Sequence, residues 1–380
     1  PWSSAASDVY KRQQLGLSQR LTVVDSDGTI FFDEPDDPIR INQIGTFVQV
    51  NKNLFKERLR ITGAFRFDKN QYFDAEYTPR FSMIWFLTSG KEQSIRGTYQ
   101  TAYRFPTIAD QWVDLDDGEF RSMGGMERVR NAYGFNTLPI YPMSGRNPVK
   151  DSVVTGNGPI VLPPLQPEKV ASAEIGYKGL FLGKKLFVDA YAYYNKYRGF
   201  QAVQLVAQLA EDIGEEDDML FQTYMTTDEP VSSLGWALGL DYRFRFGLLF
   251  RGNAAFNKLL ENIDIPGVET RYNTPEYRAN LSVSHPMVIN KLGFAVNFHW
   301  QSSFLWESAF GAGNSPAFST LDAHITYALP RINTTLKLGA SNLLNSYYTT
   351  SFGSAQIGGL YYFTMEYNDI LGYLGKNRSD

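Results

Sequence analysis

The residue types that most often carry out catalysis are scarce in this sequence. The 380 residues include three histidines and no cysteine, which excludes thiol nucleophiles, thiolate metal sites and disulfides. No nucleophile elbow, HExxH motif or P-loop occurs. The segment GAGNSP, residues 311–316, has proline where a dinucleotide-binding loop needs its third glycine. We therefore expect a protein that is not an enzyme and that holds no cofactor.

Two groups of residues have the types, but not the arrangement, of a metal site. His299 and His324 are predicted on neighbouring strands, where alignment places His299 opposite Thr320 and several residues from His324; His285 is expected in a turn. The segment EDIGEEDD, residues 211–218, carries six carboxylates but lacks the spaced pattern and distal glutamate of a calcium loop. We interpret it as a solvated loop tip, with a calcium site as the alternative, and expect no metal.

Aromatic and acidic side chains gather instead in the long connections between predicted strands. The longest connection, residues 106–168, combines tryptophan, tyrosine and aspartate, and long irregular loops are often functional. Such side chains suit stacking on sugars or the capping of a bound ligand; the alternative is a loop that packs on itself and shields the site. The predicted ligand-binding residues are Trp112, Asp114, Asp116, Tyr133 and Trp306.

The elements that must position these residues are strands, because alternation of polar and apolar residues dominates the sequence. In SIRGTYQTAYRF, Ile95 and Tyr99 share one face, whereas Arg96 and Arg104 lie on the other. Most strands are longer than the five or six residues of an ordinary strand and suit a tilted membrane crossing of about 9–11 residues. The thirteen predicted strands lie near 44–54, 58–68, 77–88, 93–105, 169–180, 185–197, 233–245, 247–258, 275–285, 290–302, 317–328, 334–341 and 358–368.

The connections between these strands alternate between short and long, as in a barrel that crosses a membrane with short turns on one side and long loops on the other. The polar face carries many charges, which are costly in a dry core but not beside water. We predict that Arg96 and Arg104 face a hydrated lumen, where they form salt bridges to a plug or to neighbouring strands, or bind an anionic ligand. The apolar face would then contact outer-membrane lipid. The net charge of −4 gives no basic footprint for nucleic acid.

The expected fold is therefore all-β: an incomplete antiparallel transmembrane β-barrel. A soluble sheet, the alternative, explains neither the strand lengths nor the alternating connections. Single-chain bacterial barrels usually have an even number of strands, so the odd count indicates a truncated barrel. The first residues, PWSSAASDVYKRQ, resemble translated adapter sequence, and we expect 1–13 to be an artefact, 14–368 to be the C-terminal part of the barrel, and 369–380 to be an atypical tail.

Four motifs, in order, resemble those of TonB-dependent outer-membrane receptors. They are GAFRFDKNQYFDAEYTPRFS (63–82), YQTAYRFPTIADQW (99–112), LQPEKVASAEIGYKGLF (165–181) and LKLGASNLLNSYYTTSFGSAQIGGLYYFTMEY (336–367). Each motif alone is weak, but all four fall on the predicted strands and their ends. The sequence is most similar to the large-receptor branch that often bears a carboxypeptidase-regulatory-like N-terminal domain.

This resemblance implies a barrel of about 22 strands, of which this chain would supply about 13, closed by an N-terminal plug that this chain lacks. Such receptors lie in the outer membrane of Gram-negative bacteria. They bind scarce ligands, including siderophores, cobalamin and oligosaccharides, and import them with energy passed through TonB by way of the plug. A surface lipoprotein is a further expected partner for a glycan ligand. The alternatives are a passive porin or channel and, third, a barrel enzyme, for which no catalytic set is apparent.

Overall fold

The computed structural model describes residues 11–144, 158–261, 265–308 and 311–367. It contains one large antiparallel sheet of fourteen strands, as expected for an incomplete barrel. Residues 1–10 of the expected artefact, and the expected tail 369–380, lie outside the described residues. The strands of the large sheet are β1 (Lys11–Val24), β2 (Ile39–Leu54), β3 (Leu59–Asn70), β4 (Glu76–Phe86), β5 (Gln93–Arg104), β9 (Glu168–Phe181), β10 (Leu186–Arg198), β13 (Val231–Arg243), β14 (Leu249–Leu259), β16 (Tyr277–Ile289), β17 (Leu292–Gln301), β20 (Phe318–Leu329), β21 (Thr334–Ser341) and β22 (Leu360–Tyr367).

Each strand of the large sheet pairs with the next one along the chain, from β1 at one edge to β22 at the other. Within the described residues, β1 and β22 do not pair with each other, so the sheet is open. The predicted register between β17 and β20 is confirmed: His299 lies opposite Thr320, and His324 lies opposite Ala295. The prediction that His285 sits in a turn is wrong, because β16 continues through it to Ile289.

The thirteen predicted strands are all present, but the first strand of the sheet, β1, was missed. Its sequence alternates, with Leu15, Leu17, Leu21 and Val23 exposed along one face. Its first residues, 11–13, fall within the expected artefact, and Gln19 interrupts the apolar series. Strand β1 pairs with β2 over its whole length, from Lys11 opposite Lys52 to Val24 opposite Ile39.

The two faces of the large sheet differ in the way that the alternation predicts. Apolar side chains such as Tyr99, Ile175 and Trp236 remain 41–64% exposed, which suits contact with lipid rather than with a packed core. On the opposite face, Arg96 donates to Glu174 at 3.1 Å and to Asp189 at 2.8 Å, on neighbouring strands. A charged ladder of this kind needs either water or paired partners.

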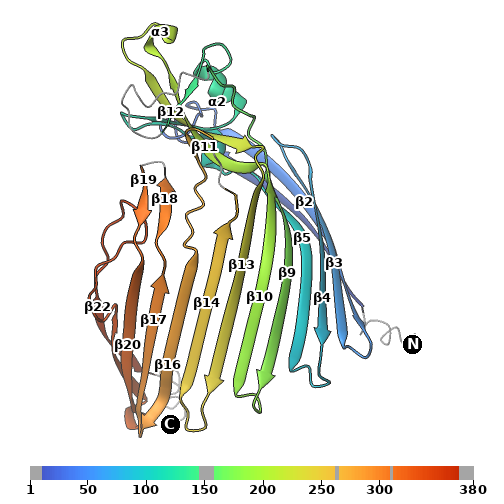
Figure 1. Ribbon diagram of the computed structural model, residues 1–380, viewed down its shortest axis with the longest axis vertical. Helices are drawn as coiled ribbons and strands as arrows, with labels where there is room; N and C mark the ends of the chain where they lie inside the picture. The colour runs from blue at the N-terminus through green and yellow to red at the C-terminus, as the bar shows by residue number, and fades with distance from the viewer. Residues whose placement is uncertain (1–10, 145–157, 262–264, 309–310, 368–380) are drawn as a thin grey trace, which may run out of the picture.

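The short and long connections are sorted to opposite ends of the sheet (Figure 1). The short connections include residues 55–58, 182–185 and 290–291, whereas residues 105–167 and 199–230 form two of the long connections. Figure 1 shows the long connections rising above the sheet and building further structure there. The long connections therefore contain strands and helices that the alternation pattern does not predict.

The long connections form a second sheet with strand order β15-β11-β12-β7-β6, in which β8 also pairs with β11. We call this assembly, residues 106–144, 158–167, 199–230 and 265–276, the cap. A separate hairpin, β18–β19, rises from the connection between β17 and β20. The remaining elements are α1 (Ile108–Trp112), β6 (Asp114–Asp116), β7 (Arg121–Met123), α2 (Glu127–Ala132), β8 (Tyr141–Pro142), β11 (Phe200–Gln208), α3 (Ala210–Ile213), β12 (Met219–Thr227), β15 (Val268–Glu269), β18 (Phe304–Ser308), β19 (Gly311–Ser315) and η2 (Pro330–Ile332).

The cap has a packed core, which also includes Val24 of β1 and Ile39 and Ile41 of β2. All nine residues of β11 are buried, and Phe221 of β12 makes ring contacts with Tyr133 and Phe135 at centroid distances of 5.8 and 5.1 Å. Gly125 allows close packing, because a Cβ at this position would lie 2.2 Å from the carbonyl oxygen of Tyr224. The acidic segment 211–218 forms α3 and an exposed turn beyond it.

None of the described helices is both long enough and apolar enough to cross a membrane.

Candidate functional site

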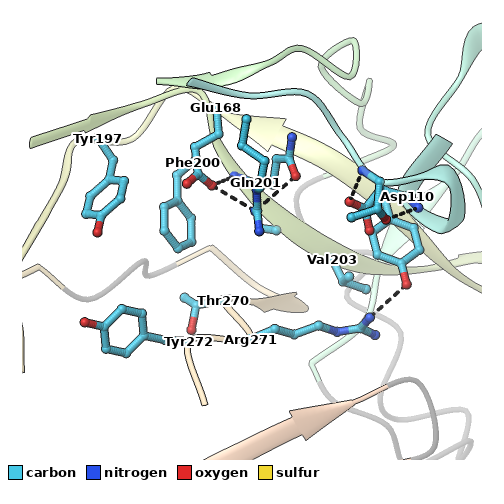
Figure 2. A pocket seen from close by; sticks show the side chains of 13 residues that line it. Asp110, Glu168, Tyr197, Phe200, Gln201, Val203, Thr270, Arg271 and Tyr272 are labelled. Atoms are coloured by element: carbon cyan, nitrogen blue, oxygen red, sulfur yellow. Dashed lines mark hydrogen bonds and ion pairs between the residues drawn. The ribbon is translucent and has the colours of Figure 1, made fainter. Parts of the chain in front are cut away.

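A pocket of about 350 Å³ lies where the strands of the large sheet end beneath the cap (Figure 2). The ends of β5, β9 and β10 meet β11, β12 and the segment after β15 at this place. We call it the mouth pocket. It is lined by Arg104, Thr107, Asp110, Glu168, Tyr197, Phe200, Gln201, Ala202, Val203, Tyr224, Thr270, Arg271 and Tyr272.

One side of the mouth pocket is a charged cluster at the start of β9 and the end of β5. Arg104 donates to Glu168 at 3.2 Å and to the side-chain oxygen of Gln201 at 3.1 Å. The backbone N–H of Gln201 donates to the same carboxylate at 3.3 Å. The cluster therefore joins Gln201 of β11 to two strands of the large sheet.

The other side is formed by Arg271, whose side chain extends along the pocket (Figure 2). It donates to the hydroxyl of Tyr224 at 3.0 Å and to the side-chain oxygen of Gln222 at 3.2 Å, and its guanidinium lies 5.3 Å from the Tyr224 ring centroid. Its backbone has φ of 50°, in the left-handed region. This costly conformation is held by Glu307, which accepts from the Arg271 backbone N–H at 2.7 Å.

Aromatic side chains complete the mouth pocket. Tyr197 and Phe200 meet edge to face at 5.6 Å, and Figure 2 shows Tyr272 across the pocket from them. The hydroxyl of Tyr272 accepts a hydrogen bond from the side-chain amide of Asn257, and burial raises the pKa of Tyr272. Guanidinium groups next to phenol rings can hydrogen-bond and stack on a ligand; Asp110, by contrast, is engaged in the capping box of α1 with Thr107.

The predicted site residues lie in four separate places. Arg104 lines the mouth pocket, whereas Arg96 lies further along β5 in its ion pairs with Glu174 and Asp189. Trp306 lies in the β18 hairpin, beside Phe304 at 6.3 Å. The remaining four lie in the cap: Trp112, Asp114 and Tyr133 are at least partly buried, and Asp116 is at the surface.

Trp112 does not have the exposure that its predicted ligand contact requires. Only 2% of it is exposed, because it belongs to the core of the cap and packs edge to face on Tyr72 at 5.2 Å. Its place at the end of α1 turns it inward, beneath the connection between β1 and β2: the backbone N–H of Phe32 donates to the Trp112 carbonyl at 2.8 Å.

Asp114, Asp116 and Tyr133 come together around Arg121 rather than around a pocket. Asp114 accepts from Arg121 Nε at 2.7 Å and from the Tyr133 hydroxyl at 2.8 Å. Asp116 is exposed and lies 3.4 Å from the same guanidinium. Burial, followed by the bond to Asp114, raises the pKa of Tyr133 to about 12. These contacts connect β6 and β7 to the C-terminal end of α2.

Sequence reasoning missed Arg271, Tyr272, Tyr197 and Gln201 of the mouth pocket. Arg271 and Tyr272 stand in a predicted long connection, residues 259–274, so their types and position were a usable signal. Tyr197 and Gln201 gave no such signal, because only the fold of β11 over the strand ends brings them to the pocket.

A family model described as TonB dependent receptor-like, beta-barrel matches residues 4–343 of this sequence. The chain belongs to the TonB-dependent receptor family. Members of this family are transporters rather than enzymes, and they lie in the outer membrane of Gram-negative bacteria; membership does not favour the passive porin considered above. A search of the curated proteins found no match.

Solved structures show the receptor fold at low sequence identity. A mutant ferric enterobactin receptor, PfeA from Pseudomonas aeruginosa, has a TM-score of 0.62 at 12% identity and covers 94% of this chain and 51% of its own. The siderophore receptor PirA from Acinetobacter baumannii has a TM-score of 0.60 at 13% identity, and the match covers 93% of this chain and 52% of PirA. The FrpB iron transporter from Neisseria meningitidis has a TM-score of 0.60 at 11% identity, and the match covers 93% of this chain and 53% of FrpB. The chain thus spans about half the length of these receptors.

Proposed function

We propose that this chain is part of an outer-membrane receptor that binds a scarce small-molecule ligand at the mouth pocket and takes part in its TonB-coupled import. The family membership carries this proposal. The open edges at β1 and β22 support the view that further strands complete the barrel. TonB would act through a plug domain from the part of the receptor that precedes the barrel.

In this proposal the cap faces the outside of the cell and the short turns face the periplasm. The exposed apolar side chains of the large sheet support contact with lipid, since the bilayer core is apolar. The long connections lie at the end where Arg104 and Arg271 meet the pocket, and long loops of bacterial barrels lie on the outer side.

An anionic, iron-binding siderophore is the ligand class that we favour. Arg104 and Arg271 supply positive charge on the two sides of the mouth pocket, and Tyr197 and Tyr272 supply rings and hydroxyls. The neighbours PfeA and PirA are a ferric enterobactin receptor and a siderophore receptor, and one PfeA structure contains enterobactin. Cobalamin and an oligosaccharide, the latter with a partner lipoprotein, are the other classes to be tested.

The test is ligand uptake by cells that express the gene containing this chain in a strain without its own receptors. Labelled ferric siderophores, cobalamin and oligosaccharides would be compared with and without TonB. We expect uptake of a ferric siderophore that requires TonB and that Arg271→Gln lowers about tenfold, while the exposed Arg198→Gln control leaves it unchanged. Uptake that persists without TonB would contradict the proposal; uptake of only another ligand class would contradict the siderophore assignment alone.

A further inference from the structure

A second cavity, of about 510 Å³, lies inside the cap and shares no lining residue with the mouth pocket. It opens between α2, the segment 161–165 and the connection between β3 and β4. We call it the cap cavity. A volume of this size falls in the range of about 300–1,000 Å³ that small-molecule sites occupy.

The cap cavity has apolar walls and a polar rim. Its walls include Phe73, Ile140 and Leu165, all buried, together with the partly buried Phe135 and Leu162. The rim carries exposed side chains of α2 and of the turn that follows it: Glu127, Asn131 and Asn136. Walls of this kind accept an apolar body, and the rim stays in contact with water.

The cavity also contains a buried guanidinium. Arg130, on α2, lines the cavity with only 7% of its surface exposed. It donates to the carbonyl oxygens of Pro163 and Tyr224, each at 2.7 Å, and its Nε has no partner among the described residues. In that part of the chain no carboxylate lies within 4.0 Å of it, although Glu127 is on the same helix.

Among the described residues, this arrangement leaves a positive charge without a counter-charge. Burial lowers the pKa of Arg130 to about 10, so the side chain stays protonated at neutral pH. A buried charge is costly unless an opposite charge compensates it, and two neutral carbonyl groups compensate it only in part. A carboxylate that entered the cavity would supply the missing negative charge and accept the remaining N–H groups.

The rim restricts the kind of anion that fits. Glu127 places a negative charge at the entrance, so a second anionic group on the ligand would be repelled there. The walls, with Phe73, Phe135 and Leu162, favour an aromatic or branched apolar body. The chemistry of the cavity therefore matches a ligand with one carboxylate at one end and apolar groups along the rest.

We propose that the cap cavity is a binding site for a hydrophobic monocarboxylate, whose carboxylate pairs with Arg130 and whose apolar body lies against the aromatic walls. The site is separate from the mouth pocket and does not depend on which ligand the receptor imports. Occupancy would stabilise the cap, because a ligand that binds the folded state alone raises its stability by mass action.

The test uses 3-phenylpropionate as the probe and its neutral amide as the matched control, added to the purified gene product in non-ionic detergent at neutral pH. We expect isothermal titration calorimetry to show saturable binding of one carboxylate per chain and at least about tenfold weaker binding of the amide. Arg130→Met should weaken carboxylate binding by at least about tenfold, whereas Arg128→Met, an exposed arginine on the same helix, should leave it unchanged. Glu127→Gln should strengthen binding severalfold by removing the repulsion.

Three results would each overturn the proposal: no saturable binding, equal affinity for acid and amide, or equal loss in Arg128→Met and Arg130→Met. Arg130 also hydrogen-bonds to the segments that contain Pro163 and Tyr224. The affinity of the Arg130→Met variant is therefore compared with the wild type only after hydrogen exchange shows that its cap is folded. If that variant is unfolded, the amide comparison and Glu127→Gln decide, since Glu127 is exposed and its replacement leaves the packing intact. If carboxylate binding by Glu127→Gln were unchanged or weaker, Glu127 would not repel the carboxylate at the entrance, and the proposed site would be refuted.

Discussion

Single charged residues in this receptor differ mainly in what compensates their charge. The guanidinium of Arg104 has a carboxylate partner, Glu168. The guanidinium of Arg271 donates to two neutral oxygens, and its Nε lies 3.7 Å from the carboxylate of Glu269. Arg130 has only carbonyl groups among its described partners. A guanidinium with an incomplete set of partners has more to gain from an anionic ligand, so we look for ligand binding at Arg271 and Arg130 before Arg104.

We expect Glu307 to make the contact between the β18 hairpin and the segment after β15 sensitive to pH. Burial raises the pKa of this carboxyl above its usual 4.5, with Glu269 adding to the effect. A carboxyl group whose pKa is raised by folding binds its proton more tightly in the folded state than in the unfolded state. Between the two pKa values, the folded chain therefore keeps a proton that the unfolded chain has already released. The free energy of unfolding therefore falls as pH rises from about 4.5 through the raised pKa.

We expect Glu307→Gln to remove this fall. The measurement is the hydrogen-exchange protection of the segment 268–273 and of β18 as a function of pH, corrected for the intrinsic exchange rate. The exposed Glu119→Gln variant is the control and should keep the wild-type slope. The same slope in Glu307→Gln as in the wild type would show that another group is responsible.

At the scale of elements, thirteen of the fourteen strands of the large sheet can be predicted from the sequence, and the strands of the cap cannot. Alternation is a local signal, and long runs of it mark strands that have one apolar and one polar face. Strand β11, FQAVQLVAQ, is buried on both faces, so it has no alternation to detect. The burial of Trp112 has no local signal either, because only the fold of the connections around α1 decides whether that ring lies inside or outside.

The packed core of the cap should unfold separately from the large sheet. Phe221 is fully buried between Tyr133 and Phe135, and we expect Phe221→Ala to destabilise the cap by about 3–5 kcal/mol through the cavity it leaves. Met219→Ala, at the 38% exposed start of β12, should cost about 0.5 kcal/mol or less. Hydrogen exchange resolved by segment measures both; equal loss of protection in β9 and β10 would show that cap and sheet unfold as one unit.

At the scale of the whole molecule, the described residues form an open sheet with two unpaired edges rather than a closed barrel. An unpaired strand edge exposes N–H and C=O groups that lipid cannot satisfy, and β1 and β22 do not pair with each other in the described structure. The exposed apolar face adds a second surface that water does not tolerate. From both features we expect this chain to reach its stable state only with further strands.

We therefore expect the isolated chain, refolded in detergent, to lack the heat-resistant compact form of a closed barrel. Gel electrophoresis in dodecyl sulfate, with and without boiling, should give the same mobility in both lanes. The complete receptor should run faster when it is not boiled. A heat-dependent shift of the isolated chain would mean that its fourteen strands close without help.

The cap is assembled from pieces that are far apart in the sequence, and this bears on how such receptors diversify. Its sheet takes strands from three different connections, and a bridge between Phe31 and Val113 ties in a fourth. If recombination replaced one connection, the strands and side chains of the other three connections would face a surface to which they are not complementary. Variation in this outer region should therefore be inherited as a block, and exchange of single loops between related receptors should yield folded hybrids only rarely.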